Sequence, residues 1–304
     1  MLRPFHRREM LNALAGAGAV SLLANAKAQT SGDGRSAPDA NAPRPRLLPG
    51  CCAYSYGKYL KAGSMTMEDF IVKAVELGVL GVEITTYWLK STDEAYLATL
   101  RRFAQRQGMP ISGLSIGAQM CQSDAAKRRE VVDTIVKWVD ATEHLGASHL
   151  RVFGDTLPPG ATEAQGVEWV AETMKPACEY SGKKGITLGL ETHMGLTLKA
   201  SNVTAILRRV DSPFAGCTLD ISNFHDSPYE QIAACLPFAT NTHIRDYWGE
   251  AKTPLDLDRV WRMFAKQGFK GYMSAEYEAD EDPTTGVPKL IEKIKTLCRK
   301  YSSA

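Results

Sequence analysis

Short apolar runs alternate with longer amphipathic segments along the chain from Leu47 onward. The apolar runs are bounded by glycine or polar residues, a pattern that is typical of buried strands. They predict strands at 50–54, 81–84, 111–116, 149–153, 186–191, 216–220, 241–244 and 271–276. The segments between them repeat apolar positions every three or four residues, which is typical of helices that bury one face. They predict helices at 66–77, 92–107, 125–145, 163–183, 202–209, 229–236, 257–267 and 288–301.

Eight strand–helix units in succession predict a parallel sheet that is covered by helices. That number of units favours closure into a (β/α)₈ TIM barrel, a single domain that we place at 47–304. The competing fold is an open doubly wound sheet, which usually carries a glycine-rich phosphate turn after its first strand. Here the first strand is followed by Ser55-Tyr56-Gly57-Lys58, which lacks that turn. We therefore expect the closed barrel.

The first 46 residues differ from the rest of the chain. Arg7 and Arg8 precede an apolar stretch at 11–26, and Ala26-Lys27-Ala28 has small residues at the spacing that a signal peptidase accepts. We expect a twin-arginine-type signal peptide at 1–28, recognition by the twin-arginine export machinery, and a periplasmic or otherwise exported protein. Residues 29–46, dominated by Ser, Gly, Pro, Asp and Asn, predict a disordered linker. The alternative is an amphipathic tail on a cytoplasmic protein.

The charge argues against a nucleic-acid-binding protein, and the spacing of the cysteines argues against a disulfide framework. The formal net charge is +2, but residues 1–28 contribute +3, so the remainder is near −1 and does not predict a nucleic-acid partner. The seven cysteines form no closely spaced pattern, and we expect Cys51 and Cys217 to be buried thiols. One disulfide remains open in an oxidising compartment. The oligomeric state also stays open, including a homo-oligomer.

Polar residues occupy the ends of the last four predicted strands. The fifth strand ends in Glu191, the sixth in Asp220 and the eighth in Glu276, and the seventh carries His243. The carboxyl ends of barrel strands meet at one mouth, where the active site lies. Three carboxylates and one imidazole are ligands for a divalent metal, with Mn²⁺ expected and Mg²⁺, Co²⁺ or Zn²⁺ as alternatives. Taken singly, each residue could instead be a helix cap, an ion-pair partner or a structural histidine.

Four segments carry a resemblance to a known family. They are LGLETH at 188–193, TLDISNF at 218–224, THIRD at 242–246 and GYMSAEYE at 271–278. The chain resembles the xylose-isomerase-like barrels from about Leu47 to Arg299, and more narrowly the sugar phosphate isomerase/epimerase group. In the ketose 3-epimerases of this family the matching Glu, Asp, His and Glu bind the metal, and the two glutamates also move protons. The resemblance thus implies Glu191 and Glu276 as the acid/base pair.

The resemblance implies a divalent-metal-dependent sugar isomerase or epimerase. Such an enzyme abstracts a proton next to a metal-bound carbonyl and works through an ene-diolate. Two positions depart from the epimerases: Asn223 stands where they carry a substrate-binding histidine, and Thr197 where they carry a glutamate. A lyase that eliminates from 3-keto-glycosides and a non-catalytic sugar-binding barrel therefore remain alternatives. The apurinic endonucleases of this fold use a richer histidine set than this chain provides.

Further candidates lie near the same strand ends. His193 is a third catalytic candidate, or else a loop histidine. Asp246 is expected to support the metal ligands. Arg151 could contact substrate or pair with Glu83. Trp88 and Trp248 could stack on a sugar or pack within loops. The expected substrate contacts are Arg151, Arg245, Asn223, Trp88 and Trp248.

Overall fold

The computed structural model describes residues 44–154 and 156–303. The predicted signal peptide and residues 29–43 of the predicted linker lie outside this range. The described end of that linker differs from the expectation, because Arg46 already begins the first strand and its backbone N–H donates to the Phe269 carbonyl at 2.9 Å. Within the described ranges, none of the helices has the length and apolar character needed to cross a membrane.

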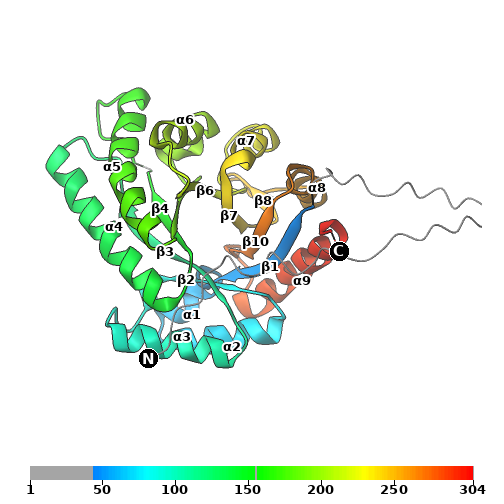
Figure 1. Ribbon diagram of the computed structural model, residues 1–304. Coiled ribbons are helices and arrows are strands. Elements are labelled where there is room, and N and C mark those ends of the chain that lie inside the picture. Colours follow the sequence, from blue (N-terminus) through cyan, green and yellow to red (C-terminus); the bar gives the residue numbers. More distant parts are fainter. Residues whose placement is uncertain (1–43, 155, 304) are drawn as a thin grey trace, which may run out of the picture. The chain divides into compact units, whose positions relative to one another are not determined.

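Eight parallel strands close into a barrel, which confirms the predicted fold class. Around the barrel they follow the order β1-β10-β7-β6-β5-β4-β3-β2, and the helices surround them (Figure 1). The strands are β1 (Arg46–Cys52), β2 (Val82–Thr85), β3 (Ile111–Gln119), β4 (His149–Phe153), β5 (Thr187–Glu191), β6 (Ala215–Asp220), β7 (Ala239–Ile244) and β10 (Lys270–Ala275). Consecutive strands pair in parallel, so their carboxyl ends lie at the same mouth.

The helices alternate with the strands as the apolar pattern predicts. They are α1 (Gly57–Lys61), α2 (Met67–Leu77), α3 (Glu94–Arg106), α4 (Ala125–Leu145), α5 (Glu163–Lys183), α6 (Ala200–Val210), α7 (Pro228–Cys235), α8 (Leu257–Gln267) and α9 (Pro283–Tyr301). Short 3₁₀ turns follow three of the strands, η1 (Ala53–Tyr56), η2 (Thr86–Trp88) and η3 (Gly195–Leu198), and η4 (Leu236–Phe238) joins α7 to β7. Thr66 and Asp69 form a reciprocal capping box at the start of α2.

Three features were not predicted from the pattern. Helix α1 lies within the first connection, and a small hairpin of β8 (Tyr247–Trp248) and β9 (Thr253–Pro254) follows β7. Helix α9 begins at Pro283 rather than 288, since the Asp282 side chain accepts from the Thr284 N–H and Pro283 fits the first helical turn.

All seven cysteines are buried and no disulfide joins any of these described residues.

The barrel interior is tightly packed where β5 leads to the site. A Cβ on Gly189 would lie 2.5 Å from the His149 ring and still closer to the Thr218 hydroxyl. Glu191 follows two residues later on the same side of the strand, because strand side chains alternate. The lack of a side chain at Gly189 thus lets β5 sit deep enough to present Glu191 at the mouth.

Gly189→Ala is expected to lower the free energy of unfolding by about 1–3 kcal/mol through overpacking. The matched substitution Gly113→Ala brings a Cβ no closer than 3.2 Å to the His149 carbonyl oxygen and should cost less. Thermal denaturation of both variants beside the wild type measures the difference. Equal midpoints for the two variants would show that the interior has room at Gly189.

Candidate metal centre

Four strand ends bring the predicted ligand residues together. Glu191 ends β5, Asp220 ends β6, His243 lies near the end of β7, and Glu276 follows β10. One ligand atom from each of the four lies within 4.8 Å of those of the others. The exposed fractions of these residues are 2% for Glu191, 0% for Asp220 and His243, and 7% for Glu276. Together they form a buried group of three carboxylates and one imidazole, which we call the ligand cluster.

The imidazole of His243 lies among the carboxylates of the cluster. Its Nδ1 is 3.0 Å from Glu191 Oε1 and 3.4 Å from Glu276 Oε1. The pKa of His243 lies well above its usual value: burial opposes the charge, and the carboxylates of Glu276, Glu83 and Glu191 more than offset burial. The surroundings of Nδ1 therefore favour positive charge, which is the environment that a bound cation requires.

Glu83 lies behind His243 and was not predicted as part of the site. It is completely buried on β2 and accepts hydrogen bonds from the Ser115 hydroxyl, the Asn241 amide and, at 2.9 Å, His243 Nε2. Burial raises the pKa of Glu83, but the charge and hydrogen bond of His243 and the Ser115 hydroxyl bring it down to about 2. An ionised carboxylate only accepts, so Nε2 carries the proton and Nδ1 faces the cluster.

Two buried arginines also reach the cluster. Arg245 contacts the carboxylates of Asp220 and Glu278, and its Nη2 is 3.7 Å from Glu276 Oε2. Arg151 Nε is 2.9 Å from Glu191 Oε2, and its Nη1 donates to the Ile116 carbonyl at 2.8 Å. Each guanidinium therefore pairs with a carboxylate of the cluster.

The charges of the site are not balanced by these side chains. The carboxylates comprise Glu83, Glu278 and the three of the cluster, and they face two guanidiniums and one imidazole. Even with a protonated imidazole, negative charge is in excess. Because unpaired buried charge is costly, the donor set fits a divalent cation.

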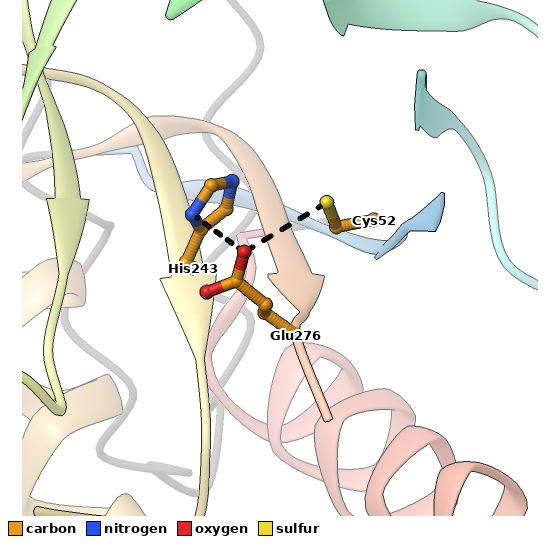
Figure 2. Close-up of side chains that lie close together, drawn as sticks. All are labelled: Cys52, His243 and Glu276. Carbon is orange, nitrogen blue, oxygen red and sulfur yellow. Dashed lines mark hydrogen bonds and ion pairs between the residues drawn. The ribbon is translucent and has the colours of Figure 1, made fainter. Parts of the chain in front are cut away.

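Cys52 adds a softer candidate ligand beside the cluster. Figure 2 shows the Cys52 thiol and the His243 ring turned toward the Glu276 carboxylate. The Cys52 Sγ is 4.0 Å from Glu276 Oε1 and 3.5 Å from Thr85 Oγ1, and Cys52, His243 and Glu276 form a second group with ligand spacing. Burial and then Glu83 raise the pKa of this thiol to about 11, so it stays protonated at neutral pH. The four-residue cluster, rich in oxygen, remains the better fit to a hard cation.

A family model described as "Xylose isomerase-like TIM barrel" matches residues 71–297. The chain belongs to this family. The match spans the ends of β5, β6, β7 and β10, and so includes every residue of the ligand cluster. No curated protein matches the sequence.

Several solved structures share this xylose isomerase-like fold. A D-allulose 3-epimerase from Methylomonas sp. has 20% identity and a TM-score of 0.65, over 84% of this chain and 99% of that one. A 3-keto-D-glucoside 4-epimerase from E. coli has 14% identity and a TM-score of 0.64, over 83% and 100%. A probable 3-DHS dehydratase from Bacillus anthracis has 14% identity and a TM-score of 0.63, over 82% and 98%. At such low identities the likeness shows the fold.

Asn223 and Thr197 stand where the ketose 3-epimerases carry a histidine and a glutamate. In this chain both side chains have contacts within the protein. Asn223 Nδ2 donates to Asp220 Oδ2 at 2.8 Å and to the Thr192 carbonyl at 3.0 Å. Thr197 is buried, and its hydroxyl accepts from the His193 N–H at 3.2 Å. Asn223 therefore orients a predicted ligand, in addition to its predicted place near substrate.

The other predicted residues are half-buried or paired within the barrel. The His193 ring is half-buried and stacks on Phe153, with ring centroids 4.4 Å apart. Trp88 is half-buried in η2, and Trp248 in β8 is partly buried against the core. Arg151, for which substrate or Glu83 was the expected contact, pairs with Glu191.

Asp246, which was predicted to support the metal ligands, pairs with a lysine of α9. Its carboxylate accepts from Lys293 Nζ of α9 at 2.6 Å and is 39% exposed. Glu83, rather than Asp246, contacts the His243 ring. The reason is geometric: Asp246 lies in the connection after β7, whereas Glu83 comes from β2 on the other side of the barrel.

Glu83→Gln is expected to lower the affinity for Mn²⁺ by about 10- to 100-fold, as loss of a partner behind a ligand does. A glutamine amide can donate to Nε2, which lets the proton move to Nδ1 and blocks that nitrogen as a ligand. Calorimetric titration with Mn²⁺ measures the affinity, and ¹⁵N NMR of the metal-free protein reports the protonated nitrogen. Ser115→Ala keeps the carboxylate and should have a smaller effect. Wild-type affinity in Glu83→Gln would show that Glu83 does not act through His243.

Proposed function

We propose that this protein is a divalent-metal-dependent sugar isomerase or epimerase. The observation that carries the proposal is the ligand cluster, in which four neighbouring strands of a xylose isomerase-like barrel bring three buried carboxylates and one imidazole together. Residues of this kind at the carboxyl ends of barrel strands are typical of catalytic sites. The known activities of structurally similar proteins, two sugar epimerases among them, support the same class of substrate.

Glu191, Asp220, His243 and Glu276 would hold the metal. A divalent cation supplies Lewis acidity, which polarises a substrate carbonyl and makes the neighbouring C–H acidic. Oxygen-rich ligands favour Mn²⁺, with Mg²⁺, Co²⁺ and Zn²⁺ as alternatives. Glu83 orients His243, and Asn223 and the Ser222 N–H hold the Asp220 carboxylate at 2.8 Å each. These contacts keep the ligands in place before any cation binds.

Glu191 and Glu276 are the proposed proton carriers. They come from β5 and β10, which are separated in the barrel by β6 and β7, so their carboxylates reach the centre from different sides. One carboxylate oxygen removes a proton from a substrate carbon on one face, and the other returns a proton. Return to the opposite face of the same carbon gives an epimer, and return to the neighbouring carbon gives an isomer. Arg151 and Arg245, paired with these carboxylates, hold them in position.

A lyase reaction is the second candidate, because the same deprotonation expels a leaving group from the next carbon. The pocket favours it in one respect: Asn223 and Thr197, which replace two sugar-binding residues of the ketose epimerases, are engaged within the chain. A 3-keto-glycoside has an acidic C–H beside its carbonyl and an aglycone on the adjacent carbon. The similarity in fold to a probable dehydratase is in keeping with elimination.

Product identification tests the proposal. The purified protein with Mn²⁺ is incubated with free ketoses and with 3-keto-glycosides, and the products are assigned by NMR. We expect an epimer or an aldose, whereas a released aglycone with an unsaturated sugar would establish the lyase. Complete recovery of every substrate would overturn both.

We also propose export through the twin-arginine pathway, with residues 1–28 removed and residues 29–43 acting as a linker before the barrel. The paired Arg7 and Arg8 and the Ala26-Lys27-Ala28 segment support this proposal. Amino-terminal sequencing of the protein from a periplasmic fraction should begin near Gln29. An intact amino terminus in a cytoplasmic fraction would contradict export.

A further inference from the structure

An aromatic cavity of about 440 Å³ lies between the connection after β1, the turn η2 and residues 277–283, which lead from β10 into α9. Tyr54, Trp88 and Tyr277 line it, together with the charged side chains of Lys58, Glu278 and Asp282. A volume of this size accommodates a six-membered ring. Aromatic rings beside charged groups are typical of sites that hold a ring with an apolar face and polar edges.

The indole of Trp88 has a fixed place in this cavity. The Tyr54 ring lies 5.6 Å from it, at an interplanar angle of 35°. On another side, a Cβ on Gly57 would be only 2.8 Å from the indole, so the ring packs directly on the backbone of α1. Trp88 is thereby held in position as one wall of the aromatic cavity.

Residues on either side of Glu276 line the aromatic cavity or bond to its lining. Glu278 lines both it and a second, polar cavity of about 230 Å³ that includes Asn223 and Arg245. Ser55, also in its lining, donates to the Ala275 carbonyl at 3.0 Å and accepts from the Tyr277 N–H at 2.9 Å, on either side of Glu276. The aromatic cavity therefore lies next to the end of β10, after which Glu276 follows.

We propose that the aromatic cavity is a subsite for the ring attached to the reacting sugar, so that the substrate is a glycoside rather than a free monosaccharide. The proposal rests on the proposed function, since it assumes that the reacting sugar lies at the ligand cluster. The attached ring stacks on Trp88, and its polar edge meets Lys58 and Asp282, whose charged groups are 2.6 Å apart at the outer end. An aromatic aglycone and a second sugar ring share the chemistry that this subsite recognises.

Binding of unreactive compounds tests the subsite without requiring turnover. Calorimetry of the purified protein with Mn²⁺ compares phenyl β-D-glucopyranoside, cellobiose and D-glucose. We expect at least one of the two-ring compounds to bind about tenfold more tightly than glucose, equivalent to about 1.4 kcal/mol. Preference for the phenyl glucoside indicates an aromatic aglycone, and preference for cellobiose a second sugar. Equal affinities for all three compounds, or no binding, would overturn the proposal.

Two substitutions act on the same wall from different sides. Trp88→Ala removes the indole, and Gly57→Ala places a methyl group against it at a residue whose φ of −52° suits alanine. Both should abolish the preference for a two-ring compound over glucose. Trp169→Ala, at a half-buried tryptophan of α5, is the control and should keep the preference. If both Trp88→Ala and Gly57→Ala still prefer a two-ring compound, the subsite is refuted. If the wild-type protein shows the preference but turns over no substrate, only the proposed reaction is contradicted.

Discussion

Replacement of Glu276 by glutamine is expected to slow proton transfer to and from the substrate by about 10²- to 10⁴-fold, the contribution of a positioned acid or base. Glutamine has nearly the same shape and keeps an oxygen toward the cluster, but its amide cannot accept the proton at neutral pH. The measurement is the rate at which deuterium from D₂O enters carbon of the substrate. Metal content is determined in parallel, because Glu276 is also a predicted ligand.

Glu292→Gln is a matched control for this substitution, since Glu292 lies on the outer face of α9 and pairs there with Lys295. It should exchange at the wild-type rate. If Glu276→Gln holds its metal and also exchanges at that rate, Glu276 carries no proton and the acid/base pair must be assigned differently.

Replacement of His243 by alanine is expected to lower the affinity for Mn²⁺ by about 100-fold or more, since even a partner behind a ligand is worth about 10- to 100-fold. The substitution removes Nδ1 from the cluster and leaves Glu83 buried without its hydrogen bond from His243. Affinity is measured by titrating Mn²⁺ into protein that a chelator has stripped of metal. Folding is followed by circular dichroism. A destabilised protein would be an expected consequence of the unpaired Glu83.

His243→Asn separates the two effects, because asparagine can still donate a hydrogen bond toward Glu83 while it provides a weaker ligand. His144→Ala is the control, at a partly exposed residue of α4 that pairs with Glu94. We expect weak binding in the asparagine variant and wild-type binding in the control. Full occupancy in a folded His243→Asn protein would show that His243 is no ligand.

The barrel and the ligand cluster were predictable because both depend on patterns that are local in the sequence. Each strand is a short apolar run, and each ligand stands at or near the end of one run. Once eight such runs close into a barrel, the ends of neighbouring strands must meet. The order of Glu191, Asp220, His243 and Glu276 along the chain then becomes their order around the mouth.

Glu83 shows why the remaining contacts could not be predicted. It is separated from His243 by 160 residues, and β2 and β7 are not neighbours in the barrel, so the contact crosses the interior. Its one signal in the sequence is a charged residue within an apolar strand. Asp246 was assigned from its closeness to His243 in the sequence, but after β7 the chain leaves the barrel and carries that side chain to Lys293.

Two further residues beside the cluster were harder still to place. Cys52 reads as an ordinary buried strand residue, and only the closure of β1 against β10 brings its thiol toward Glu276. Glu278, whose pKa burial raises to about 7 against the opposing charge of Arg245, follows the strand and faces two cavities. Such positions depend on how connections of different length fold over the mouth, which periodicity does not describe.

The central claim is that the ligand cluster, with a divalent metal, moves a proton at a carbon next to a carbonyl. Metal-dependent exchange in D₂O tests it most directly, with the substrate that product identification has established. The protein loaded with Mn²⁺ should place one solvent deuterium on carbon per turnover. Protein that a chelator has stripped of metal should place none, and added Mn²⁺ should restore the exchange. Turnover without solvent deuterium on carbon, or exchange that continues at the same rate after chelation, would contradict the account.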